Sequence, residues 1–147
     1  KITRPLKISD ESGGSASDGY ARWLKTNTIK QKQSDYCSVF ITLESGDITS
    51  NQLNAMANVI REFSSEGKAR SGFVQNVAIR YVHEDDLVNL YSELLETGLA
   101  KSGGLTMTAP VGCSGTTSCN LALTNSHRLA KEIQRKFLWQ PPGLNLR

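Results

Sequence analysis

Apolar and polar residues follow one another along the chain in periods that predict a strand and then a helix. Residues 36–43 combine β-branched and aromatic side chains and are followed by Gly46, a pattern typical of a strand. Thr49 and Gln52 have the spacing of a capping box. Apolar residues at helical spacing, from Leu53 to Phe63, follow them before Gly67, which predicts an amphipathic helix of about four turns.

The later pattern completes a recognisable order of elements. Short strands are expected at residues 68–70 and 76–82, and a second helix is expected over residues 84–98. A closing strand at residues 105–109 gives the order strand, helix, strand, strand, helix, strand. This order is the split β-α-β arrangement of a ferredoxin-like α+β sandwich. The architecture supports many functions and indicates no activity by itself.

The two ends of the chain differ from this central unit. Residues 1–19 are rich in Ser, Gly and Asp and are interpreted as a flexible arm or linker. Residues 20–109 form the predicted ferredoxin-like domain. Residues 110–147 contain an irregular loop with Cys113 and Cys119 and a helix that is expected to begin near Cys119, with Leu123 on its apolar face. This last segment lies outside the predicted ferredoxin-like domain.

The composition is that of one ordinary globular unit. The 147 residues carry a net charge of +3, and 38% of them are hydrophobic, which is too apolar for a disordered chain. The charge is too small to indicate nucleic acid, and no run approaches the roughly 18 to 20 apolar residues of a membrane span. The chain does not begin with Met, as expected of a trimmed segment. Three cysteines are too few for a disulfide scaffold, so we expect a reducing, cytoplasmic location.

Cys113 and Cys119 carry the clearest candidate chemistry, with five residues between them in a loop of Gly, Ser and Thr. Thiolates bind iron and zinc well, and Fe–S clusters usually take four of them. The helix expected near Cys119 would favour negative charge at its N-terminus. The common zinc patterns use shorter spacing, which disfavours zinc. On spacing alone, two free thiols, one adventitious disulfide or a dithiol redox pair stay open as alternatives.

Four segments in register resemble the siroheme-dependent nitrite and sulfite reductases. Residues 112–123 resemble the cluster loop of this family, whose pattern is C-x-G-x-x-x-C-x-x-A. Residues 46–53 are similar to its G-D-(I/L)-T-x-x-Q-L segment, and residues 70–76 are similar to its R-x-T-x-x-Q-N segment. Residues 23–36 resemble the approach to the second half of such enzymes. The similarity covers roughly residues 20–140 and places the chain in the C-terminal half of such a protein. It implies that residues 110–147 are the incomplete start of a second, α/β domain that binds the [4Fe–4S] cluster and siroheme.

The resemblance implies an oxidoreductase segment with defined cofactors. Family members hold a [4Fe–4S] cluster through C-x5-C and a later C-x3-C, bind siroheme, and reduce nitrite or sulfite by six electrons. Cys113 and Cys119 would then be metal ligands. Arg70, Gln75 and Asn76 would contact the siroheme carboxylates, whose geometry an Arg fork matches. No residue is assigned a catalytic role.

The resemblance also implies partners for the chain. The substrate would be nitrite or sulfite, and the other half of the pseudo-twofold reductase would complete the protein. An electron donor such as ferredoxin or a flavoprotein would supply electrons. An acidic donor of this kind could pair with the basic side chains of the last helix. No membrane and no nucleic acid is expected among the partners.

The chain departs from the family pattern at several points. The C-x3-C pair is not present and is expected beyond Arg147, and two thiolates cannot hold a four-iron cluster securely. Gly72 stands where the family has Thr, and Val74 stands at a polar position. A second interpretation therefore stays open, a non-catalytic ferredoxin-like binding module that has lost its cofactor. In that case Arg70 is a surface residue at a strand end.

Overall fold

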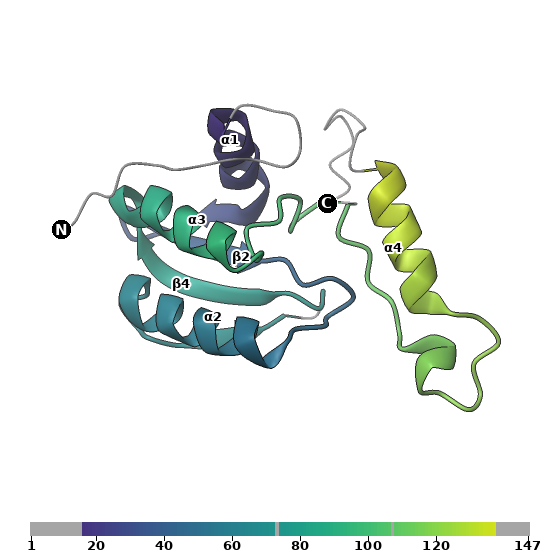
Figure 1. Cartoon of the computed structure of the whole chain (residues 1–147). Helices are drawn as coiled ribbons and strands as arrows, with labels where there is room; N and C mark the ends of the chain where they lie inside the picture. The colour runs from purple at the N-terminus through teal and green to yellow at the C-terminus, as the bar shows by residue number, and fades with distance from the viewer. Residues whose placement is uncertain (1–15, 73, 107, 138–147) are drawn as a thin grey trace.

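The computed structural model describes residues 16–72, 74–106 and 108–137, and Figure 1 shows how its elements are arranged. The helices and strands are α1 (Ala16–Asn27), β1 (Thr28–Lys30), β2 (Tyr36–Ile41), α2 (Ser50–Phe63), β3 (Ala69–Ser71), β4 (Val77–His83), α3 (Leu87–Glu96) and α4 (Ser126–Phe137). Single-turn 3₁₀ helices, η1 (Glu84–Asp86) and η2 (Gly115–Thr117), precede α3 and α4. Helix α1 begins inside the segment predicted as an arm, whose residues 1–15 lie outside the described ranges.

The strands form one antiparallel sheet in the order β1-β2-β4-β3. Strands β2 and β4 are the central pair, with Val39 opposite Ile79 and Ile41 opposite Val77. Every second side chain of β2 is buried, beginning with Cys37, so one face of the strand belongs to the core. The sheet together with the helices that pack on it confirms the predicted α+β, ferredoxin-like fold.

Helices α2 and α3 each bury one face in the same core as β2 and β4. Thr49 caps α2 as predicted, because its Oγ1 accepts a hydrogen bond from the Gln52 N–H at 3.3 Å. The Gln52 side-chain oxygen accepts in return from the Thr49 N–H at 3.2 Å. Leu53 was expected on the apolar face but is 50% exposed. The buried residues of the two helices are Met56, Val59, Ile60, Leu87, Leu90, Tyr91 and Leu94.

Helix α1 is attached to the core at two points. The Trp23 side chain is fully buried, and its ring centroid lies 5.2 Å from that of Tyr91 on α3. Asn27, the last residue of α1, is also fully buried. Its side-chain amide donates to the carbonyl oxygens of Phe40 at 2.8 Å and Lys101 at 3.0 Å. Asn27 thus joins α1 to the end of β2 and to the segment that leaves α3.

The expected closing strand at residues 105–109 is wrong. The described residues of this segment form turns, and β1 occupies the edge of β2 instead. Gly103 has a φ of +97°, and the Leu105 N–H then donates to the Thr26 carbonyl at 3.1 Å, so the chain passes over the end of α1. Five residues separate β1 from β2. This short loop costs less closure entropy than a pairing with residues after α3.

The last helix begins later than the sequence suggests. Helix α4 starts at Ser126 and not near Cys119, and Asn125 Oδ1 accepts a hydrogen bond from the Arg128 N–H at 2.9 Å. An Asn at this position satisfies a free N–H of the first turn, which fixes the start of the helix there. Leu123, which was expected on the apolar face of this helix, is 97% exposed. Figure 1 shows α4 in yellow to one side of the sheet, at the end of a long connection.

Candidate functional site

Cys113 and Cys119 lie on either side of η2, and both are exposed free thiols. Gly115 between them has a φ of +56°. A Cβ at Gly115 would lie 2.6 Å from the Ser126 nitrogen and the Thr124 oxygen, so a larger residue does not fit. The Cys119 N–H donates to the Gly115 carbonyl at 2.9 Å. The loop is therefore folded tightly against the N-terminus of α4.

The environment of Cys113 differs from that of Cys37. The Cys113 sulfur lies 3.4 Å from the Ser126 hydroxyl oxygen. Hydrogen bonds with the Ser126 side chain and the Gly115 backbone lower the pKa of the Cys113 thiol. Cys37 is 3% exposed, and its burial, followed by the nearby Glu84 carboxylate, raises the pKa of its thiol. The thiolate is the form that binds metal, so Cys113 is the better suited of these two for ligation.

Gln75 connects the ferredoxin-like fold to the cysteine loop. Its Nε2 donates to the Gly112 carbonyl at 2.7 Å, and its Oε1 accepts from the Gly112 N–H at 3.2 Å. Gly112 in turn lies against α4, since a Cβ on it would be 3.6 Å from the Cβ of Ala130. The residue before Cys113 is thus held between Gln75 and Ala130.

Asn76 is buried beside Gln75 and is 3% exposed. Its Nδ2 donates to the Gly104 carbonyl at 2.8 Å, and its Oδ1 accepts from the Leu43 N–H at 3.4 Å. Both ends of the Asn76 side-chain amide are therefore engaged with backbone groups of the chain itself.

Arg70 lies on β3 at the edge of the sheet, where its side chain is 48% exposed. Its Nη2 is 3.0 Å from the Glu66 carboxylate, which also pairs with Arg80 at 3.2 Å. Hydrogen bonds from Arg80, and then from Arg70, lower the pKa of Glu66 to about 2. Of the three residues predicted to contact siroheme, Gln75 and Asn76 are adjacent near the cysteine loop, and Arg70 is on the edge strand.

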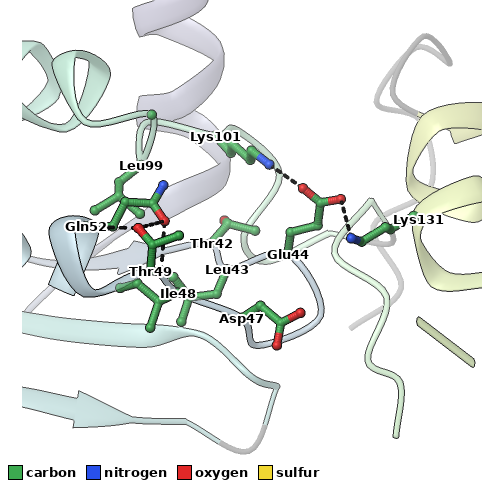
Figure 2. A pocket seen from close by; sticks show the side chains of 11 residues that line it. Thr42, Leu43, Glu44, Asp47, Ile48, Thr49, Gln52, Leu99, Lys101 and Lys131 are labelled. Carbon is green, nitrogen blue, oxygen red and sulfur yellow. Dashed lines mark hydrogen bonds and ion pairs between the residues drawn. The ribbon is translucent and has the colours of Figure 1, made fainter. Parts of the chain in front are cut away.

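A cavity of about 340 Å³ lies where α4 meets the fold, and Figure 2 shows its lining side chains. Glu44 is central to it, with one carboxylate oxygen 2.7 Å from the Lys101 Nζ and the other 3.7 Å from the Lys131 Nζ on α4. These contacts, the Lys101 hydrogen bond foremost, lower the pKa of Glu44. His127 of α4 also lies 3.9 Å from the Asp47 carboxylate.

Glu44 and Asp47 were not among the functional residues predicted from the sequence, although both lie close to side chains of α4. They flank a tight turn in which Ser45 and Gly46 have φ values of +57° and +79°, as in the turns that join hairpin strands. The Asp47 N–H donates to the Glu44 carbonyl at 3.1 Å and closes this turn. The turn could be predicted from its Gly-Asp pair, but its ion partners on α4 could not.

Comparison with known families identifies the central part of the chain. Residues 29–97, from β1 to the residue after α3, match the family described as the nitrite/sulfite reductase ferredoxin-like half domain. This segment belongs to that family. The half domain contains Arg70, Gln75 and Asn76 and ends before Cys113. No curated protein matches the chain. Within the described ranges, no helix is long and apolar enough to cross a membrane.

The residues around the half domain meet only part of what the family's cofactors require. Cys113 and Cys119 offer two thiols, whereas a [4Fe–4S] cluster usually takes four. In the part of the chain that the structure describes, no three His, Cys, Asp or Glu side chains come together to hold a metal ion. The amides of Gln75 and Asn76 are engaged with backbone groups and do not fit as free donors to siroheme carboxylates. Arg70 fits better, because an exposed ion pair is weak and its partner can be replaced.

Proposed function

We propose that the chain is part of a nitrite/sulfite reductase-like oxidoreductase whose half domain supports an iron–sulfur site next to a siroheme. The observation that carries the proposal is that a loop with two cysteines is hydrogen-bonded, through Gly112 and Gln75, to a half domain of this family. When bound, the two cofactors supply the electron path for the six-electron reduction of nitrite or sulfite. The ligands beyond Cys113 and Cys119 must come from outside the described residues.

In this proposal the chain's own contribution is to present two thiolates. A thiol must lose its proton to bind a metal, so hydrogen bonds that lower the pKa of Cys113 favour the ligating form. Ser126 and Gly115 make these bonds; Ser126 is the first residue of α4, and Gly115 begins η2. The reducing cytoplasm is the location that keeps such exposed thiols available.

Two surfaces of the chain are assigned to contacts with other groups. Arg70 is proposed to exchange Glu66 for a carboxylate of the siroheme, since its guanidinium is half exposed at the sheet edge. Helix α4 exposes the cationic residues Arg128, Arg135 and Lys136. An acidic electron donor such as ferredoxin or a flavoprotein would be attracted to them, with an affinity that falls as salt rises.

The test uses the natural gene product that contains this chain, purified without oxygen and compared with C113S and C119S. We expect the unaltered protein to show siroheme absorption bands and about four irons per chain. It should also reduce nitrite or sulfite with a reduced viologen dye. Both variants should lose most of the iron. C37S is the matched control, because Cys37 is buried in β2, and it should keep its iron.

A colourless, iron-free protein after anaerobic reconstitution with iron and sulfide would contradict the enzyme. The alternative is the non-catalytic half-domain module, and one structural observation favours it, the engagement of the Gln75 and Asn76 amides within the chain. In that case the protein stays iron-free, and C113S and C119S unfold at the same temperature as the parent. An iron-free parent whose C113S and C119S variants keep its unfolding temperature therefore favours the non-catalytic module over the enzyme.

A further inference from the structure

We propose that Gln75 and Asn76 are positioning residues that hold Gly112 and Gly104 in place and so place Cys113 at the N-terminus of α4. The proposal rests on the proposed function only for the identity of the group that the cysteines bind. It assigns these two residues a role other than the siroheme contact that the sequence suggested.

Two consecutive residues, Gln75 and Asn76, hold the two ends of one segment, Gly112 and Gly104. The Asn76 Nδ2 donates to the Gly104 carbonyl at 2.8 Å, at the point where the chain after α3 passes the end of α1. Gln75 binds both backbone groups of Gly112, the carbonyl at 2.7 Å and the N–H at 3.2 Å. The segment between these two glycines contains no helix or strand in its described residues. Side chains of the turn between β3 and β4 therefore hold both ends of this segment.

The backbone conformation of Gln75 also supports a positioning role for its side chain. Its φ is +56°, in the left-handed region that residues with a side chain rarely adopt. Gly46, with a φ of +79°, lies in close contact with Gln75, since a Cβ on Gly46 would be 3.4 Å from the Gln75 Cβ. A glycine at position 75 would relieve the backbone. A glutamine held there at two points by hydrogen bonds indicates that its side chain is needed for the contact with Gly112.

Among the described residues, few other contacts attach α4 to the half domain. Ala130 is the one buried residue of this helix in the described part of the chain, and it lies against Gly112. The remaining contacts include the ion pair of Lys131 with Glu44 at 3.7 Å and the approach of His127 Nδ1 to the Asp47 carboxylate at 3.9 Å. A solvent-accessible ion pair such as that of Lys131 contributes little. The hydrogen-bonded Gly112 is thus the main neutral contact between the half domain and the helix that accompanies Cys113.

The experiment measures amide hydrogen exchange by NMR in the 147-residue chain and in the variants Q75G, Q75A and N76A. Q75G removes the amide and relieves the backbone at the same position, so its fold is retained. We expect the Gly112 amide to exchange about fivefold to tenfold faster in Q75G and Q75A, with β2 and β4 unchanged. Q31A is the matched control, because Gln31 accepts from the Tyr81 N–H at 3.0 Å, away from the cysteines. It should leave Gly112 unchanged.

Two outcomes overturn the proposal. One is a Gly112 amide that exchanges in Q75G at the parent rate. The other is an equal acceleration of all amides in Q75G, which indicates general loss of stability and no local role. Iron content in the natural gene product provides the second readout, and we expect Q75G to lower it at least about twofold. A parent protein without iron rejects the proposed function, and the exchange rates then still decide the role of Gln75.

Discussion

Replacing Asn27 by Ala tests the buried polar contacts that join α1, β2 and the segment after α3. Asn27 is fully buried, and its amide donates to the carbonyls of Phe40 and Lys101. Its Oδ1 accepts from the N–H groups of Gly103 at 3.0 Å and Gly104 at 3.3 Å. In N27A, the Gly103 N–H keeps a second acceptor in the Thr26 hydroxyl, at 2.8 Å. The Phe40 and Lys101 carbonyls and the Gly104 N–H lose their bonds to Asn27.

A buried polar group left without a partner costs roughly 1–3 kcal/mol. Three such groups near the low end of this range, because two of the bonds are only partly buried, give with a small cavity an expected loss of about 4 kcal/mol in the free energy of unfolding. This is a large share of the total for a typical domain, about 5–15 kcal/mol.

The assay is urea unfolding followed by circular dichroism. With a slope of about 2 kcal/mol per molar urea, the midpoint of N27A should fall by about 2 M. N58A is the control, because Asn58 lies exposed on α2 and accepts only from Arg61 in the bonds that the structure records for it. Its stability should change by less than about 0.5 kcal/mol. A midpoint for N27A equal to that of N58A would show that the reasoning about unpartnered backbone groups is wrong here.

Two further predictions concern local contacts of the half domain. Arg80 and Arg70 hold the pKa of Glu66 at about 2, below its ordinary value of 4.5, so their stabilisation is complete above pH 4.5 and is lost as the pH falls towards 2. Thermal unfolding of E66Q should therefore differ from that of the parent at neutral pH and converge with it near pH 2; a constant difference would contradict this. T49A should lower the free energy of unfolding by about 1 kcal/mol in urea titrations, because the Gln52 N–H loses its acceptor, whereas T49S should keep most of it.

The elements that depend on local sequence were predicted well. The period of two in residues 36–41 gives β2, and the capping box of Thr49 and Gln52 begins α2 where expected. The helix predicted from residues 84–86 is η1 followed by α3. In each case the signal lies within a few residues of the element, because hydrophobic period and capping act over one or two turns.

The errors lie where distant parts of the chain compete. Strand β1 lies at the edge of β2, whereas residues 105–109 were expected to supply a closing strand, and no local pattern says which segment reaches an open edge first. Helix α4 begins at Ser126 because Asn125 caps it, although the apolar residues before it suggested an earlier start. Leu123 lies before this start and is exposed, so helical spacing alone did not locate the first turn of the helix.

For the candidate site, the sequence by itself determined that Cys113 and Cys119 lie in a compact glycine-containing loop and that the preceding unit is a ferredoxin-like half domain. Only the tertiary structure decided what surrounds those thiols. The backbone partners of Gln75 and Asn76 are 37 and 28 residues away along the chain. An amide side chain binds a carboxylate or a backbone group equally well, so its role depends on which group the fold brings within about 3 Å. That choice belongs to the folded chain and cannot be inferred from a local motif.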